Sequence, residues 1–165
     1  MRFGLRIFVS HARQKENQLR PLTGMRSFLR SARRLYGTVR RYTADHEWIQ
    51  PSSEGRYRVG ITDYGQRALG DLVYVELPKL GATVKQRELL GIVESVKGAS
   101  DVYAPVTGTV VAVNEGAASR PSVVNKSAEA DGWLCEIEAD RRDEYESLFD
   151  EQAYEAHCQG KSTAK

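Results

Sequence analysis

Long apolar runs are absent from this chain and cysteine is scarce, and both absences restrict what the protein can be. No apolar stretch approaches the roughly 18 residues that a membrane-spanning helix needs, so no membrane association is expected. Two cysteines, Cys135 and Cys158, cannot build a disulfide framework or a cysteine metal cluster. We expect Cys135 to be a small core residue and Cys158 to be a free thiol near the end of the chain.

The sequence also lacks the motifs that mark common enzyme active sites. It contains no phosphate-binding loop of the Gly-x-x-x-x-Gly-Lys type, no serine–histidine–aspartate set and no cysteine–histidine pairing signal. His46 has no second ligand at metal spacing, which favours a structural role for it. The chain is therefore expected to be non-catalytic and to hold no metal.

Charge is unevenly distributed, although the formal net charge is only +2. Residues 1–36 hold eight arginines, one lysine and one acidic residue, whereas the rest of the chain has six more acidic than basic residues. An Arg-rich, Ser-containing segment almost without acids is typical of a mitochondrial transit peptide, which predicts import into the matrix. Arg34 stands three residues before Gly37, so we expect cleavage after Tyr36. Nucleic-acid binding is disfavoured, because no aromatic stacking pattern accompanies the basic run.

The most informative stretch is 91–108, which predicts a strand, a tight turn and a second strand. The flanking β-branched and aromatic residues suit pleated strands: Ile92, Val93, Val102 and Tyr103. Turn-forming residues lie between them, namely Ser95, Gly98, Ser100 and Asp101, and Gly98 can take a positive φ without steric cost. Lys97 stands near the tip. A turn lysine is usually only a solvated charge, but small neighbours here would let a macromolecule reach its amine.

Two segments of this stretch resemble the lipoyl-attachment hairpin of the glycine cleavage system H protein family. They are Glu94-Ser95-Val96-Lys97 and Ser100-Asp101-Val102-Tyr103-Ala104-Pro105-Val106-Thr107-Gly108. The match is long and ungapped. It implies that Lys97 carries covalent lipoate as N6-lipoyllysine, in a turn context of Glu94, Ser95, Val96, Gly98 and Asp101. The two acidic residues either solubilise the hairpin or let the lipoylating enzyme or the P protein orient it. Gly81 is expected to serve a turn, and the resemblance places it near the face that the lipoylating enzyme inspects.

This resemblance implies a lipoyl carrier of the glycine cleavage system. The arm would carry the aminomethyl group of glycine from the P protein (glycine decarboxylase) to the T protein (aminomethyltransferase), and electrons to dihydrolipoyl dehydrogenase (the L protein). The family is thought to shelter the loaded arm in a surface cleft, for which Glu47 and residues 62–65 are candidates. The alternative is a lipoyl donor, or a lipoyl or biotinyl domain serving a 2-oxoacid dehydrogenase or another complex. Biotin attachment prefers methionines where this chain has Val96 and Gly98.

The remaining pattern predicts a mainly β domain over 37–158, followed by a polar tail at 159–165. We expect two packed small sheets of the barrel-sandwich hybrid, lipoyl/biotinyl type, with a short helix after the first strands and a helix over 140–158. The short helix should be capped by Thr62 or Asp63 and end at Gly70. Strands are expected at 57–62, 71–78, 109–114, 123–125 and 132–138, with turns or loops at 51–55 and 115–121.

Periodicity also predicts which side chains share a face. Alternation places Val73, Val75 and Leu77 together on one strand, and Trp133, Cys135 and Ile137 together on another. Helical spacing groups two further sets: Tyr64, Ala68 and Leu69 in the short helix, and Tyr145, Leu148, Phe149, Ala153 and Ala156 in the C-terminal helix. Trp48 is expected to anchor the core or its edge.

Overall fold

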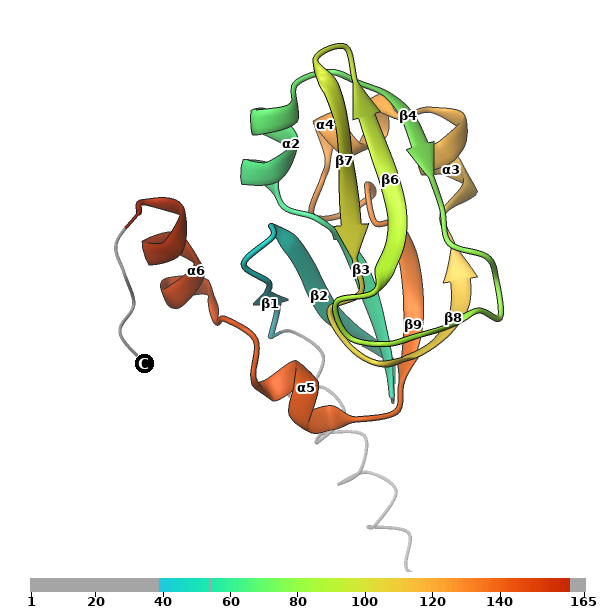
Figure 1. Ribbon diagram of the computed structural model, residues 1–165, viewed down its shortest axis with the longest axis vertical. Helices are drawn as coiled ribbons and strands as arrows, with labels where there is room; N and C mark the ends of the chain where they lie inside the picture. Colours follow the sequence, from blue (N-terminus) through green and yellow to red (C-terminus); the bar gives the residue numbers. More distant parts are fainter. Residues whose placement is uncertain (1–38, 54, 161–165) are drawn as a thin grey trace, which may run out of the picture.

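The computed structural model describes residues 39–53 and 55–160, so the expected leader, its cleavage bond and most of the polar tail lie outside the described residues. Two antiparallel sheets form the body (Figure 1). One has six strands in the order β1-β2-β3-β9-β8-β5, and the other has three in the order β4-β6-β7. The prediction of a mainly β fold with two packed sheets is confirmed.

The elements follow one another in chain order. The strands are β1 (Arg41–Tyr42), β2 (Glu47–Ser53), β3 (Arg56–Ile61), β4 (Leu72–Glu76), β5 (Thr83–Val84), β6 (Leu89–Ser95), β7 (Gly98–Tyr103), β8 (Gly108–Val113) and β9 (Cys135–Ala139). The helices are α2 (Asp63–Leu69), α3 (Glu115–Ser119), α4 (Ser122–Lys126), α5 (Arg142–Glu146) and α6 (Glu151–Cys158). In the described ranges, no helix is both long enough and apolar enough to cross a membrane.

Apolar side chains from both sheets meet in the core. One cluster joins Ile49 and Val59 of the six-stranded sheet to Leu90 of β6. A second joins Ile61 of β3 to Val93 of β6. Full burial of such side chains stabilises by roughly 1.5–3 kcal/mol each, which is what holds the two sheets together. Cys135 is a fully buried core residue as expected, and burial raises the pKa of its thiol to about 12, so the thiol is inert at neutral pH.

Helix α2 begins and ends where the sequence predicts. The hydroxyl of Thr62 accepts the Gly65 N–H at 3.1 Å, and Gly70 ends the helix with φ 86°. The expected apolar stripe is wrong, because the helix buries Gly65 and Gln66 while Tyr64 is exposed. Gln66 can be buried because its side-chain oxygen accepts a hydrogen bond from Asn125 at 2.9 Å.

The loop expected at 115–121 and the strand expected at 123–125 are both wrong, since residues 115–119 form α3 and residues 122–126 form α4. β-Branched valines favour strands locally, but tertiary contacts decide here. Val124 is fully buried in the cluster beside the three-stranded sheet. The side chain of Asn125 accepts the Leu72 N–H and donates to the Gly70 carbonyl, both at 2.9 Å, so α4 completes hydrogen bonds that the end of α2 leaves open.

Two expected strand faces are also wrong. Strand β4 changes register against β6 between Leu72 and Tyr74, so Val75 is buried while Val73 is 58% exposed. A bulge of this kind interrupts the alternation on which the expectation rested. Strand β9 starts at Cys135, which leaves Trp133 outside the ladder and only half-buried. The turn expected at 51–55 starts later, because β2 continues to Ser53 with a register shift after Pro51.

The single helix expected over 140–158 is instead two short helices, α5 and α6. Between them Phe149 exchanges two backbone hydrogen bonds with Tyr42, each 3.0 Å, and so extends the edge of the six-stranded sheet. Asp150 then caps α6 by accepting the Ala153 N–H at 2.8 Å. Of the expected stripe only Tyr145 is buried, because the break turns α6 onto a different part of the body.

Candidate functional site

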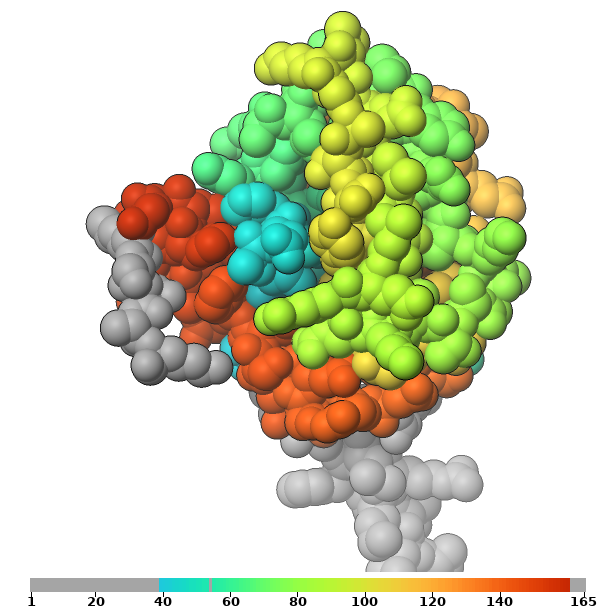
Figure 2. Space-filling view, viewed as in Figure 1, coloured from blue at the N-terminus to red at the C-terminus, as the bar shows by residue number. Residues whose placement is uncertain are grey.

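The hairpin of β6 and β7 has the predicted strand, turn and strand. Ser95 pairs with Gly98, so Val96 and Lys97 form a two-residue turn. The turn stands at one end of the molecule, far from α5 (Figure 1), and projects beyond the surrounding surface (Figure 2). Gly98 does not use the positive φ that glycine allows, and Ser100 and Asp101 lie in β7 rather than in the predicted turn.

Ser95 closes the turn in place of a positive-φ glycine. Its hydroxyl donates to the Gly98 carbonyl at 3.2 Å and accepts the Lys97 N–H at 3.1 Å. The residue is buried, so these bonds are shielded from water. A short hydroxyl that bonds its neighbouring backbone stabilises a turn without requiring glycine.

Replacing Ser95 by alanine should lower the free energy of unfolding by about 1–2 kcal/mol, because two hydrogen bonds of a buried hydroxyl are lost. Urea unfolding followed by circular dichroism measures the change. Ser100→Ala is the matched control, since the Ser100 hydroxyl makes only a 3.4 Å contact with the Asp101 carbonyl. Equal losses in the two variants would show that Ser95 does not hold the turn.

Lys97 is exposed and its amine is unpaired with any carboxylate of residues 39–53 and 55–160. The end of its side chain lies over Gly70, where an added Cβ would approach Cε and Nζ to 3.4 Å. Val96 beside it is 80% exposed. The turn therefore presents a lysine amine to solvent next to an apolar side chain, with the end of α2 beneath it.

Glu94 and Asp101 share the outward face of the three-stranded sheet. Glu94 pairs with Ala99 across the β6–β7 ladder, and Asp101 pairs with Ile92. The two pairs are two residues apart along each strand, so their side chains lie on the same face. Both carboxylates are exposed, and that of Asp101 accepts the Tyr103 hydroxyl at 3.1 Å. This arrangement gives the surface below the turn a negative charge. Gly81 lies in the turn before β5 with φ 79°, as expected of a turn glycine.

A cleft of about 120 Å³ lies between α2, the start of β2 and the β6–β7 hairpin, and we call it the α2 cleft. Its lining residues are Asp45, His46, Glu47, Ile61, Gly65, Ala68, Leu69, Val93, Ser100, Asp101 and Val102. Of the residues that were suggested from the sequence for a sheltering cleft, Glu47 and Gly65 line this one, whereas Thr62 caps α2. Apolar walls with two exposed carboxylates at Asp45 and Asp101 suit a ligand that is apolar over most of its length and basic at one point.

Comparisons with known proteins decide the family. The family model described as Glycine cleavage H-protein matches residues 40–161. The chain belongs to the glycine cleavage H-protein family. The H protein of Salmonella arizonae is 48% identical over 116 residues, covering 70% of this chain and 90% of the relative. That of a Psychrobacter species is 49% identical over 116 residues, with coverages of 70% and 92%. A crystal structure of the H protein from Mycobacterium marinum has a TM-score of 0.66 at 40% identity, covering 73% of this chain and 96% of the other.

As a member of this family, the protein is the lipoyl carrier of the glycine cleavage system and not an enzyme. Proteins of the glycine cleavage H-protein family carry lipoate covalently on a lysine, and the P, T and L proteins are their partners. The match over most of the chain decides against the biotinyl or 2-oxoacid dehydrogenase domain that the sequence left open. Both of these relatives are bacterial, and the family match begins at residue 40, after the Arg-rich segment.

Glu47 of this H protein is a buried structural residue as well as a lining residue of the α2 cleft. It is 1% exposed, and its carboxylate accepts the Tyr103 N–H at 2.8 Å and the hydroxyl of Thr43. The bond to Tyr103 ties β2 of one sheet to β7 of the other. Burial raises the pKa of Glu47, and the bonds from Thr43 and Tyr103 partly oppose that rise.

His46 is the lining residue whose partner could not be found in the sequence. Its Nδ1 lies 2.8 Å from the Tyr154 hydroxyl, 108 residues along the chain, and its backbone has φ 73°. This bond agrees with the structural role expected from the sequence. Burial, and secondarily the nearby His157, lower the pKa of His46.

Because the pKa of His46 is lowered in the folded protein, protonation of this residue should reduce the stability of the protein as the pH falls. Because its folded-state pKa lies below 6.5, the unfolded chain takes up the proton first, and stability is lost as the pH falls from about 6.5 through the folded pKa. Urea unfolding at pH 7 and pH 5.5 measures the loss. His46→Asn should show a smaller loss than the wild type. An identical pH dependence in both proteins would contradict the assignment.

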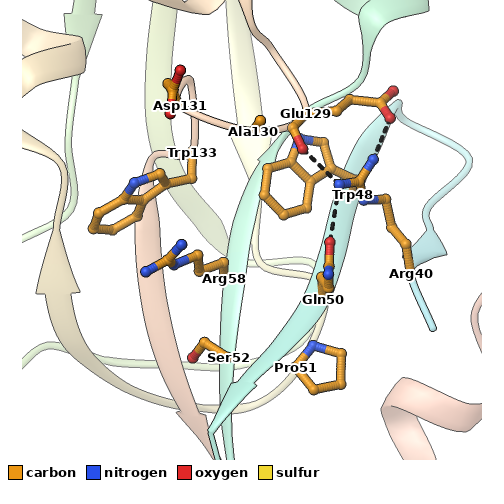
Figure 3. A pocket seen from close by; sticks show the side chains of 10 residues that line it. All are labelled: Arg40, Trp48, Gln50, Pro51, Ser52, Arg58, Glu129, Ala130, Asp131 and Trp133. Atoms are coloured by element: carbon orange, nitrogen blue, oxygen red, sulfur yellow. Dashed lines mark hydrogen bonds and ion pairs between the residues drawn. The ribbon is translucent and has the colours of Figure 1, made fainter. Parts of the chain in front are cut away.

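A larger pocket than the α2 cleft, about 490 Å³, lies on the other side of the six-stranded sheet, and Figure 3 shows the residues that line it. It contains Trp48 and Trp133, and a guanidinium group lies over each indole: Arg40 at 4.7 Å and Arg58 at 5.1 Å from the ring centroids. Arg40 also bonds Glu129 and Gln50, and Arg58 bonds Glu136 at 2.9 Å. Alternation along β2 and β3 directs this pocket away from the core. Because Arg40 is paired with Glu129 and Arg58 with Glu136, we assign this pocket a structural role at the edge that Trp48 was expected to anchor.

Proposed function

We propose that Lys97 is the residue on which this carrier receives lipoate. The supporting observation is the exposed amine at the tip of the two-residue turn, which pairs with no carboxylate of the described residues. Acylation removes the charge of a lysine, and here no ion pair within the described residues is broken by that change. Small residues on the exposed side of the turn, Gly98 and Ala99, leave room for a lipoylating enzyme.

Peptide mapping by mass spectrometry tests this proposal. The mature chain is co-expressed with a lipoylating enzyme, and lipoate is expected on the peptide that contains Lys97. Lipoate on another lysine, or biotin on Lys97, would overturn the assignment.

The turn context assists modification and docking. Glu94 and Asp101 place two carboxylates on one face of the hairpin, and Val96 adds an apolar contact. A basic surface on the lipoylating enzyme or the P protein would be oriented by these charges before contact. The hydrogen bond between Ser95 and Gly98 keeps the turn short, so the Lys97 amine is the first group that an approaching enzyme would meet.

Lipoate, when bound, supplies a dithiolane whose disulfide can be opened by a nucleophile and closed again by oxidation. The chain supplies placement. The hairpin is held by ladders to β4 and across β6 and β7, so the attachment point is rigid. A flexible arm on a rigid base turns delivery between enzymes into a tethered search at raised effective concentration.

We further propose that the α2 cleft shelters the loaded arm. Lys97 lies against Gly70, which ends the helix that forms one wall of this cleft, so the arm starts beside it. Leu69 and Val93 provide apolar contacts, and Asp45 and Asp101 provide carboxylates for a basic cargo. A cavity of about 120 Å³ is below the usual 300–1,000 Å³ of ligand sites, so we expect the arm to lie partly in solvent.

We propose that residues 1–36 are a mitochondrial transit peptide removed after Tyr36, that 37–158 is the carrier domain of the matrix and that 159–165 is a polar tail. The composition of the leader supports this. The family match starts at residue 40, only a few residues after the proposed bond.

Arg34→Ala should block or displace cleavage, because arginine three residues before the cut is the feature that the protease would read. Import into isolated mitochondria, followed by mass measurement of the product, tests this. Arg33→Ala is the matched control and should still yield a product that begins at Gly37. A wild-type product that begins far from Gly37 would refute the boundary.

A further inference from the structure

The C-terminal helix α6 reaches the α2 cleft through one hydroxyl group. Tyr154 is 7% exposed, and its Oη lies 2.8 Å from His46 Nδ1 and 2.7 Å from Thr62 Oγ1. His46 lines the cleft, and Thr62 caps the helix that forms its wall. A single hydroxyl on α6 therefore connects two parts of the cleft that come from different segments of the chain.

His46 is held in an unfavourable conformation by its surroundings. A φ of 73° is uncommon for a residue other than glycine, because its Cβ atom crowds the backbone in that region. Its carbonyl accepts the Thr62 N–H at 2.8 Å, and Gly65 packs so closely that an added Cβ would lie 3.2 Å from the His46 Cβ. Residues kept in such conformations by several contacts are concentrated at functional sites.

The ring of His46 is surrounded by groups from three elements. The Tyr64 ring on α2 lies at 4.7 Å, and the Tyr154 and His157 rings on α6 each lie at 5.8 Å, measured between centroids. Asp45 precedes it and Glu47 follows it, both lining the cleft. The bond to Tyr154 uses Nδ1, and Nε2 has no hydrogen-bond partner within the described residues. The orientation of the ring is therefore set by α6, whose Tyr154 hydroxyl is also bonded to one of the two nitrogens that can carry the proton.

Helix α6 is itself docked through the same side chain. The Tyr154 ring stacks on Tyr42 with centroids 4.5 Å apart and planes within 7°. His157 adds a bond between its Nε2 and the Ala44 carbonyl at 3.0 Å. The position of His46 thus depends on whether α6 is docked on β1.

We propose that Tyr154 is a positioning residue for the α2 cleft, fixing the ring orientation and tautomer of His46 so that the cleft can hold the lipoyl arm. This inference rests on the proposed role of the cleft. It gives α6 a part in the carrier function although the helix carries none of the attachment residues. Undocking of α6 would release His46 and the cap of α2 together.

Tyr154→Phe tests the proposal, since it keeps the stack on Tyr42 and removes only Oη. The ¹⁵N chemical shifts of the His46 imidazole are measured on the lipoylated protein. We expect one tautomer in the wild type and a mixture of both in the variant. The rate at which the loaded arm loses its carried group is measured as well, and should rise about fivefold, which corresponds to one hydrogen bond of ordinary strength.

Tyr145→Phe is the matched control. Tyr145 is also a buried tyrosine of the C-terminal segment, but its hydroxyl donates to the Val39 carbonyl, away from the cleft. It should lose stability without changing the His46 shifts or the release rate. A single unchanged tautomer and a wild-type release rate in Tyr154→Phe would overturn the proposal.

The wild-type protein provides a test that does not depend on the variant folding. Two equally populated His46 tautomers in the lipoylated wild type would overturn the positioning role directly. Release from the wild type that is as fast as from a lipoylated hairpin peptide would instead overturn the sheltering role of the α2 cleft, and this inference with it. A fixed tautomer and slow release in the wild type, both lost in Tyr154→Phe, support it.

Discussion

Lys97→Arg should abolish lipoate carriage while the protein stays folded. The guanidinium group remains protonated in proteins, so it is a poor acceptor for an activated acyl group. The side chain at this turn is exposed and unpaired with the described carboxylates, so stability should change by no more than about 0.5 kcal/mol. Intact mass shows whether the arm is attached, and glycine–bicarbonate exchange by purified P protein shows whether the carrier works.

Lys79→Arg is the matched control, because Lys79 is exposed in the loop after β4 and makes the same chemical change away from the hairpin. It should be fully lipoylated and active. Retained lipoylation in Lys97→Arg would refute the attachment site. A drop in its melting temperature of many degrees would instead show that the lysine is part of the structure.

The parts of the fold that were predicted correctly depend on residues close together in the sequence. The hairpin of β6 and β7 and the cap of α2 by Thr62 each involve a few neighbouring residues with direct conformational preferences. Local patterns report such features well, because the interactions that they encode are complete within one turn or one strand pair. The proposal of Lys97 as the attachment site also rests on local residues, those of its own turn.

The parts that were predicted wrongly depend on distant contacts. Val124 lies in a helix because Asn125 bonds Leu72 and Gly70, more than 50 residues earlier. The C-terminal helix is divided because Phe149 pairs with Tyr42. No spacing rule connects such residues, and helical or strand preferences of single residues are weak enough to be overridden.

The same limit applies to the candidate site. Glu47 was suggested only through the family resemblance, and nothing local indicated that its carboxylate meets the Tyr103 N–H, 56 residues away. His46 was expected to be structural, but its bond to Tyr154 could be found only in three dimensions. The α2 cleft is assembled by the packing of helices and strands that are far apart in the chain.

Glu47→Ala should destabilise the protein by about 3–5 kcal/mol, the range for breaking a buried polar network and leaving a cavity. The Tyr103 N–H would lose its acceptor. The Thr43 hydroxyl, which donates to the Glu47 carboxylate and accepts the Glu47 backbone N–H, would keep only the second of these two bonds. The consequence is larger than the sum of two bonds suggests, because the bond to Tyr103 joins β7, the strand that follows the Lys97 turn, to the six-stranded sheet. Urea unfolding at pH 7 measures the loss, and a value below 1 kcal/mol would contradict the bridging role.

Glu47→Gln separates the hydrogen bond from the charge. The amide oxygen can still accept the Tyr103 N–H, so the loss at pH 7 should be about 1 kcal/mol, far below that of the alanine variant. Burial raises the folded-state pKa of Glu47 above 4.5, so the folded protein takes up this proton before the unfolded chain does. Acidification through that folded pKa towards 4.5 therefore stabilises the wild type through Glu47, and the glutamine variant should lack this gain. The free energies of unfolding of the wild type and Glu47→Gln at pH 7 and pH 5 measure this gain. Equal changes in the two proteins would show that the ionised carboxylate lies in water rather than between the sheets.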